Sequence, residues 1–240
     1  FVMERILREI YIYPIKSLGG IRLKKSVVLP KGLQYDRRWM LVDATGRFMT
    51  QRTHPQMALI KVEIKANEVH LRASSGETHA FHVEETSGKE NDVVIFDEVV
   101  KACHVNLRTG EWFSDIMKTT CHLVHFPEKN ARPVERQYAI NNDHVSLADG
   151  FPFLIIGESS LQDLNARLEV PLPINRFRPN FVFSGGDPFE EDAWTEFTIG
   201  KNRFAGVKPC ARCVIPTINQ DTAEKGIEPT KTLAMYRRKD

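Results

Sequence analysis

The sequence has little of what marks secreted, membrane-spanning or nucleic-acid-binding proteins. Its four cysteines among 240 residues are too few for a small disulfide-bonded scaffold, so a reducing cytoplasm is the expected compartment. No apolar run approaches the length of about 18 residues that suggests a membrane-spanning helix, and one of the longest covers only 151–156. The formal net charge is +2, which gives no reason to expect a nucleic acid or a membrane surface as partner.

Two common ligand motifs are also missing. Lys16-Ser17 has the residues that end a P-loop, but the glycines that precede them in a Walker motif are absent. The histidine pairs 79/82 and 122/125 lie in expected strands. An odd separation places two side chains of a strand on opposite faces, so neither pair converges on a metal ion.

The regular pattern that is present is that of short β-strands. Hydrophobic residues make up 42% of the chain and charged residues 27%, an ordinary globular balance. Runs rich in β-branched and aromatic residues, bounded by turn signals, predict strands at 6–15, 20–29, 40–42, 58–65, 69–73, 78–83, 93–96, 99–105, 121–126, 153–156, 181–183, 195–199 and 203–207. Helices are predicted only at 109–117, from 160 onward, and at 230–237. Many short strands and few helices indicate a mainly β fold of barrels or sandwiches.

A polar segment bounded by prolines, 127–133, predicts a domain boundary. We therefore expect a first domain at 1–127 and a second at 128–240.

Two cysteines stand three apart near the end of the chain. Arg212 lies between Cys210 and Cys213, and Lys208 lies just upstream; such cations favour the thiolate, which is the form that binds metals. Three functions compete: a redox dithiol, half a zinc site, or a single ligand to a metal cofactor. The segment 214–218 contains Pro216 among β-branched residues and predicts a strand, whereas a thioredoxin-type pair opens a helix.

A zinc site is weakly supported, because structural zinc takes about four ligands and the other two cysteines, Cys103 and Cys121, form no close pair. Two thiols packed as small buried hydrophobic groups remain the alternative to any function.

Three cations each lie beside a hydrogen-bonding residue. Lys16 lies beside Ser17, Arg37 beside Asp36, and Arg178 near Asn180. Each cation alone is typical of a solvated surface. Together they could clamp an anion, because arginine binds phosphate in a bidentate manner and lysine adds a point charge.

Asp187 follows two glycines and precedes a proline, a setting typical of a turn. The functional alternative is a carboxylate in a cleft loop that gives or takes protons.

Four segments in this order resemble a known family, the MOSC proteins with an N-terminal β-barrel domain. The family includes the mitochondrial amidoxime-reducing components and their bacterial counterparts. The likeness spans nearly the whole chain and is carried by Tyr13-Pro14-Ile15-Lys16-Ser17, Asp36-Arg37-Arg38-Trp39-Met40-Leu41-Val42, Phe177-Arg178-Pro179-Asn180 and Cys210-Ala211-Arg212-Cys213.

The resemblance implies an N-terminal β-barrel-like domain and a MOSC β-barrel with the molybdenum cofactor between them. It implies that Cys213 is the metal ligand and that Asp187 is the active-site acid. The cofactor contacts that it implies are Lys16, Ser17, Arg37, Arg178, Asn180 and Arg212. The segment 146–152 also resembles a family loop, to which no contact is assigned. Family members continue past the equivalent of Arg237 with further strands, so the second domain can be incomplete at its C-terminal end.

The function that the resemblance implies is reduction of N-hydroxylated small molecules, with electrons from a separate donor protein. The alternatives are a sulfur-transfer or cofactor-carrier protein and a non-catalytic β-barrel binding module.

Overall fold

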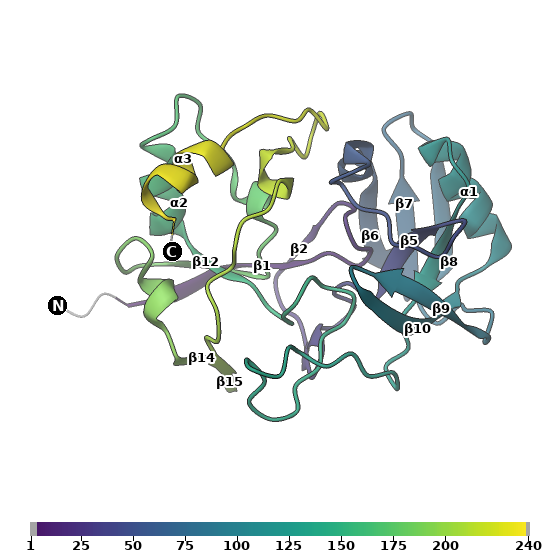
Figure 1. Ribbon diagram of the computed structural model, residues 1–240, viewed down its shortest axis with the longest axis horizontal. Helices are drawn as coiled ribbons and strands as arrows, with labels where there is room; N and C mark the ends of the chain where they lie inside the picture. Colours follow the sequence, from purple (N-terminus) through teal and green to yellow (C-terminus); the bar gives the residue numbers. More distant parts are fainter. Residues whose placement is uncertain (1–3, 239–240) are drawn as a thin grey trace.

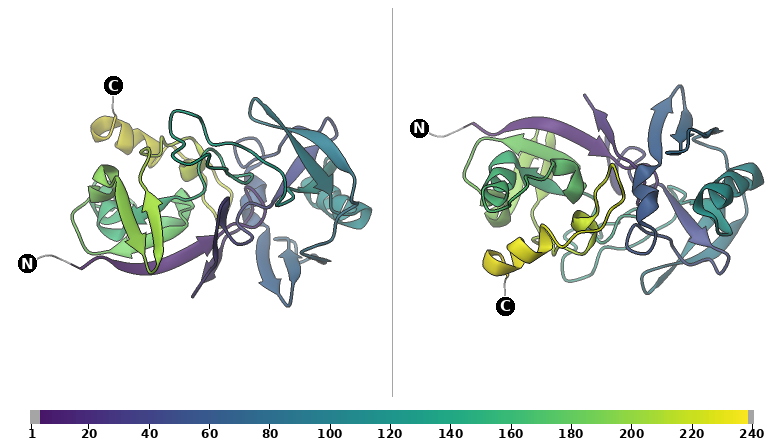
Figure 2. Two further views of the ribbon diagram at one scale, coloured as in Figure 1. Left: turned by 90° about the horizontal axis from the view of Figure 1, so that it is seen from below. Right: turned by 90° about the horizontal axis from the view of Figure 1, so that it is seen from above.

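β-Strands form most of the regular structure in the computed structural model, which describes residues 4–238 and has two lobes (Figure 1). The predicted mainly β fold is confirmed. Within 4–238, no helix is both long enough and apolar enough to cross a membrane. The first and last described elements, β1 and α3, lie in the same lobe (Figure 2).

The sheet of this first lobe combines strands from both ends of the chain. Its order is β12-β13-β1-β2, formed by Ile155–Gly157, Phe181–Ser184, Ile6–Ile12 and Ile21–Leu23. β1 runs antiparallel to β13, with Ile6 opposite Ser184 and Ile10 opposite Phe181. The loop that leaves β1 and the loop that enters β13 therefore meet at one end of the sheet, although they are far apart in the sequence.

The second lobe contains two antiparallel sheets and a helix. One sheet has the order β5-β11-β10-β9, with bounds Trp39–Asp43, Cys121–His125, Glu98–His104 and Glu90–Ile95. The other is β6-β7-β8, with bounds Lys61–Lys65, Glu68–Arg72 and Thr78–His82. α1 (Leu107–Met117) packs against β11 and β8. Trp39 and Phe113 are fully buried in the shared core.

Smaller elements complete the first lobe and the connections. Two two-stranded ribbons are β3–β4 (Val28–Leu29, Gly32–Leu33) and β14–β15 (Glu196–Ile199, Asn202–Ala205). The remaining helices are α2 (Glu158–Asn165) and α3 (Thr230–Tyr236). The 3-10 helices are η1 (Pro55–Leu59), η2 (Ile174–Phe177), η3 (Glu190–Ala193) and η4 (Ile215–Thr217). Residues 126–154, all within the described range, contain no helix and no strand.

Three sequence predictions of local structure were wrong. The strand expected at 214–218 is the 3-10 helix η4, because Pro216 falls in its first turn, where the missing N–H costs nothing. The strand expected at 20–29 is split into β2 and β3 by residues 24–27. α2 begins at Glu158 rather than at Ser160, because the Ser160 hydroxyl donates to Glu191 instead of capping the helix.

Candidate functional site

The site begins where the loop after β1 meets the loop before β13. The N–H of Tyr13 donates to Oδ1 of Asp36 over 2.8 Å, and the Tyr13 ring is buried. The guanidinium carbons of Arg37 and Arg178 lie 4.3 and 4.2 Å from the centre of this ring. A ring face attracts cations, so Tyr13 holds both arginines in one place.

Hydrogen bonds fix the direction of the Arg37 guanidinium. Its Nη1 donates to Oδ2 of Asp36 over 2.6 Å and to Oδ1 of Asn180 over 3.2 Å. Asn180 is 1% exposed, and its Nδ2 donates to the carbonyl of Tyr11 on β1 over 3.1 Å. Burial lowers the pKa of Arg178 to about 10, which leaves it charged at neutral pH. Asn180 therefore joins the two loops and helps to orient Arg37.

Three of the predicted cofactor contacts have left-handed backbone conformations. The φ angles of Ser17, Arg37 and Arg178 are 69°, 48° and 53°. Each such angle costs a non-glycine residue about 1–2 kcal/mol, and residues of this kind gather at active sites and ligand clamps. The clustering at this end of the sheet is an independent sign of a binding site.

A second cluster adjoins the first through Leu147. The Leu147 N–H donates to the Arg37 carbonyl over 3.1 Å, and its own carbonyl accepts from Nζ of Lys16 over 2.8 Å. Lys16 Nζ also donates to Oδ1 of Asp149 over 2.5 Å, and Nη2 of Arg52 lies 3.0 Å from the second carboxylate oxygen. Asp149 therefore bridges two cations.

The ionisation of this bridge follows from its surroundings. Burial lowers the pKa of Lys16 to about 8, against the opposing attraction of Asp149. Burial acts to raise the pKa of Asp149, but the charges of Lys16 and Arg52 outweigh it and hold that pKa well below its usual range. At neutral pH the carboxyl group is a carboxylate.

Cys213 lies beside this cation bridge. Its Sγ is 3.7 Å from Nη2 of Arg52 and accepts from the N–H of Ile215 over 3.5 Å. Cys213 is half-buried, whereas Cys210 is exposed. The other terminal nitrogen of Arg52, Nη1, is buried and has no hydrogen-bond partner among residues 4–238. Because buried donors are normally paired, this nitrogen suits an acceptor from a bound group.

The structure brings together five of the predicted cofactor contacts, namely Lys16, Ser17, Arg37, Arg178 and Asn180. Contacts through Arg52 and Asp149 connect Cys213 to this group. The carbonyl of Ser17 accepts from Nε2 of Gln51 over 2.7 Å, and Gln51 in turn pairs with Gln220.

The other two predicted residues differ in their positions: Arg212 packs against η2, and only Asp187 lies at the far end of the sheet. The guanidinium of Arg212 packs over the ring of Phe177, 5.1 Å from its centre. Asp187 is exposed in the turn after β13, where its N–H donates to Glu190 over 3.2 Å. That turn is at the Ile6 end of the sheet, whereas Asn180 is at the other end of β13.

Four residues of the site were not predicted from the sequence, namely Arg52, Asp149, Gln51 and Gln220. Only Asp149 could have been suspected from the sequence, because it lies in the segment 146–152 that resembles a family loop. Nothing local distinguishes Arg52 or the two glutamines from ordinary polar surface residues, and only the fold brings them to Cys213 and Ser17.

Known proteins resemble the chain along nearly its whole length. Residues 4–120 match the MOSC N-terminal beta barrel domain and residues 142–240 match the MOSC domain. The rat protein named mitochondrial amidoxime reducing component 2 is 34% identical over 244 residues, which cover 95% of this chain and 71% of that protein. The chain belongs to the MOSC family. The membership predicted from the four segments is therefore confirmed.

Other relatives of this MOSC chain have two different names. Human mitochondrial amidoxime-reducing component 1 is 31% identical over 253 residues, covering 97% of this chain and 72% of that protein. The molybdenum cofactor sulfurase of Arabidopsis thaliana is 32% identical over 257 residues, covering 97% of this chain but 31% of that protein. Segments similar to nearly the whole of this chain thus occur in proteins named for reduction and for sulfur chemistry.

The charges of the site in this MOSC chain suit an anionic ligand. The cations Lys16, Arg37, Arg52 and Arg178 gather around two carboxylates, Asp36 and Asp149. Four positive charges against two negative ones leave two positive charges to be neutralised. Among residues 4–238, no three His, Cys, Asp or Glu side chains are grouped so that they could hold a metal ion. A group with several anionic oxygens fits both this excess and the unpaired Nη1 of Arg52.

Proposed function

We propose that this MOSC chain binds a molybdenum cofactor and reduces N-hydroxylated compounds with electrons from a separate donor protein. The observation that carries the proposal is the chain of contacts from Cys213 through Arg52 and Asp149 to Lys16. It joins one soft sulfur ligand to an anion-binding group. The names of the relatives, amidoxime-reducing components among them, support the substrate class.

The residues divide between holding the metal and holding the phosphate. Cys213 would supply a thiolate, a soft ligand suited to a cofactor-bound metal, and Arg52 would stabilise its negative charge. Lys16, Arg37 and Arg178 would bind the anionic phosphate, because their charges exceed those of the nearby carboxylates. Ser17, Asn180 and Arg212 stay proposed contacts. The bound cofactor would supply the redox chemistry of the reaction.

Reduction of an N–OH group to N–H takes up two electrons and two protons and releases water, so a proton donor is required. Asp149 is linked to Cys213 through Arg52, but its pKa is held well below its usual range, so it has no proton to give at neutral pH. We propose that Asp149 orients Lys16 and Arg52. Asp187, exposed at the far end of β13, is the proposed proton donor. Asp187→Asn should lower kcat by about a hundredfold or more and Asp149→Asn by about tenfold. An unchanged kcat in Asp187→Asn would refute its role as the acid.

The metal ligand can be tested with a matched pair of variants. Cys213→Ala should lose most of the molybdenum per chain, while Cys210→Ala should keep it, because Cys210 is exposed and Cys213 adjoins the cation group. Molybdenum is measured after expression in a host that makes the cofactor, and the pterin is identified after oxidation. Full molybdenum in Cys213→Ala would refute the ligand assignment.

Sulfur transfer is the second candidate function. It is favoured by the half-buried position of the Cys213 thiol and by the likeness to a molybdenum cofactor sulfurase. Reduction of an amidoxime with an artificial electron donor would support the reductase, whereas a persulfide trapped on Cys213 without such activity would support sulfur transfer. If the protein carried neither molybdenum nor a persulfide, the function supported would be that of a non-catalytic binding module. The cytoplasm stays the predicted compartment, although the relatives are named mitochondrial.

A further inference from the structure

The loop that carries Asp149 lies between two buried cations. The carbonyls of Ser146, Ala148 and Asp149 accept hydrogen bonds from the guanidinium of Arg132 over 2.9, 2.6 and 3.2 Å. The carbonyl between the first two, that of Leu147, accepts from Lys16 instead. Every carbonyl from 146 to 149 is therefore bound by a cation.

Arg132 is saturated by these contacts although it is only 2% exposed. Its Nε and Nη2 donate to the two carboxylate oxygens of Glu98 over 3.1 and 2.8 Å. With the three carbonyl bonds, all five N–H donors of a guanidinium have a partner. Glu98 is the first residue of β10, so the loop is anchored to a strand of the second lobe.

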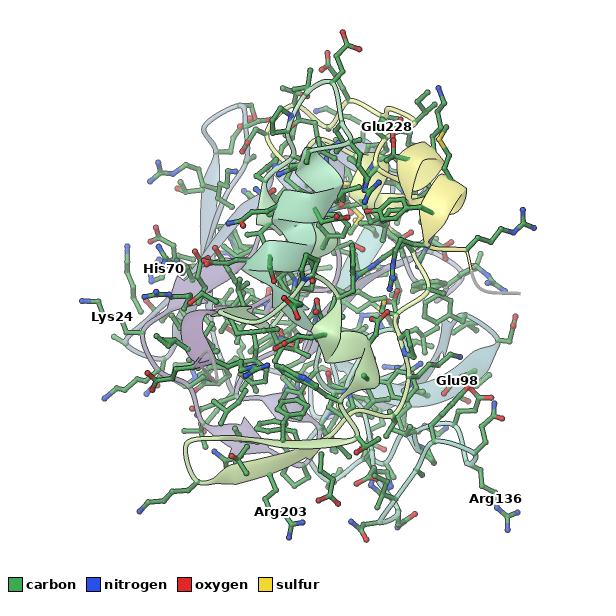
Figure 3. All side chains as sticks on the ribbon, turned by 90° about the vertical axis from the view of Figure 1, so that its left-hand side faces the viewer. Lys24, His70, Glu98, Arg136, Arg203 and Glu228 are labelled. Atoms are coloured by element: carbon green, nitrogen blue, oxygen red, sulfur yellow. The ribbon has the colours of Figure 1, made fainter. Side chains whose placement is uncertain are left out.

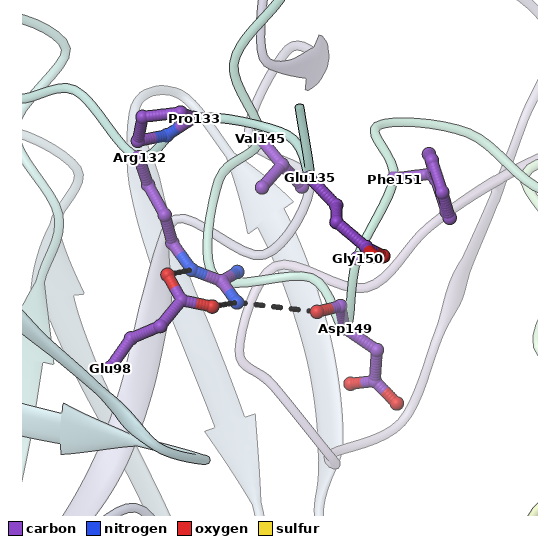
Figure 4. A pocket seen from close by; sticks show the side chains of 8 residues that line it. All are labelled: Glu98, Arg132, Pro133, Glu135, Val145, Asp149, Gly150 and Phe151. Atoms are coloured by element: carbon purple, nitrogen blue, oxygen red, sulfur yellow. Dashed lines mark hydrogen bonds and ion pairs between the residues drawn. The ribbon is translucent and has the colours of Figure 1, made fainter. Parts of the chain in front are cut away.

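The carboxylate of Asp149 emerges on the side away from Arg132. Arg132 and Asp149 both line a hollow of about 330 Å³. Figure 4 shows the carbonyl of Asp149 bound to Arg132 while its carboxylate points away from Arg132. That carboxylate meets Lys16 and Arg52. Because the loop has no helix or strand of its own, its conformation depends on the groups that bind its carbonyls.

We propose that Arg132 is a positioning residue of the site: it fixes the loop 146–149 so that the Asp149 carboxylate stands against Lys16 and Arg52, next to Cys213. The consequence for catalysis rests on the proposed function, whereas the effect on the loop does not. A lysine cannot replace Arg132, because one ammonium group has three donors and lacks the planar fork that binds Glu98 and three carbonyls at once.

The effect on the loop is measured by hydrogen exchange in the cofactor-free protein. Arg132→Lys should speed exchange of the Val145 and Leu147 amides by about tenfold or more, since these N–H groups donate to the carbonyls of Arg132 and Arg37. Glu98→Gln should speed this exchange less, because the substitution weakens the contact between residue 98 and Arg132 but leaves the guanidinium in place. Arg136→Lys is the control: Arg136 is on the same segment and projects into solvent (Figure 3).

The Val105 amide, which is buried and donates to the carbonyl of Leu123 in β11 over 3.0 Å, reports whether each variant is folded. Unchanged loop exchange in Arg132→Lys, with Val105 still protected, would overturn the proposal. If Arg132→Lys failed to fold, Glu98→Gln would decide: loop exchange equal to that of Arg136→Lys would overturn the proposal, and selective acceleration would support it.

Activity separates positioning from simple loss of stability. Expressed per bound molybdenum, kcat of Arg132→Lys should fall about tenfold or more with KM little changed, because a transition-state interaction is lost. A merely structural role would lower molybdenum and activity together and leave kcat per molybdenum unchanged, which would overturn the proposal. Should the wild-type protein bind no molybdenum, the proposed function fails, and the exchange experiment still decides the role of Arg132 in the loop.

Discussion

The charge of Lys16 depends on its buried surroundings. Its pKa of about 8 lies below the value of roughly 10.4 for a free lysine. Between these two pH values the native protein holds fewer protons than the unfolded chain, so this group makes the free energy of unfolding rise with pH. Lys16 is mostly charged at pH 7 and loses its charge as the pH rises through 8.

This titration predicts a pH-dependent anion affinity. In the cofactor-free protein, the affinity for inorganic sulfate should fall as the pH rises through 8, because the site loses one of its positive charges. Lys16→Arg stays protonated and should remove most of this dependence. Calorimetric titrations between pH 6.5 and 9.5 measure both proteins. An identical pH profile in the two would contradict the prediction.

At the scale of elements, α1 shows how local sequence and packing combine. Asn106 caps the helix by accepting from the N–H of Thr109 over 2.7 Å, and Lys118 ends it with a φ of 55°. Phe113 points into the core and is fully buried, while Leu107 is 72% exposed. The helix is therefore held on its sheets mainly by one face.

Truncation on the two faces of α1 should have unequal costs. Phe113→Ala should lower the free energy of unfolding by about 3–5 kcal/mol, because it leaves a cavity beneath the helix. Leu107→Ala should change it by less than about 0.5 kcal/mol. Urea unfolding of both variants gives these values. Similar losses in the two would mean that α1 is not packed as described.

At the scale of the whole molecule, two glutamines join distant parts of the chain. Gln51 and Gln220 exchange hydrogen bonds between their amides over 3.1 and 3.0 Å, and both are buried. Gln51 also donates to the carbonyl of Ser17, and Lys225 donates to the carbonyl of Arg52 over 2.9 Å. These contacts hold the segment after Cys213 against the segment that carries Arg52.

Breaking this pair should destabilise the protein and weaken the site together. Gln51→Ala and Gln220→Ala should each lower the free energy of unfolding by about 1–3 kcal/mol, because each leaves a buried amide unpaired. The double variant should lose less than the sum, and molybdenum per chain should fall in all three. Gln56→Ala, at an exposed position, is the control. Strictly additive losses would show that the two amides act independently.

The sequence by itself determined the mainly β class, the helix at 109–117 and the four segments that mark the family. These features depend on local preferences: alternation of apolar residues, turn residues and the spacing of functional groups within a few positions. Local preferences still gave a wrong strand at 214–218, because a proline among β-branched residues, here Pro216, fits the first turn of a 3-10 helix as well as a strand.

The tertiary structure alone decided which groups meet at Cys213. Arg52 and Asp149 reach it from segments far away in the sequence, and Asp187 does not approach the cation group because β13 places it at the opposite end of a sheet. The reason is physical: the antiparallel pairing of β1 with β13 is a long-range contact whose partners no local pattern specifies. Once that pairing forms, the buried cations of both loops are forced together, and their mutual repulsion favours an anion between them.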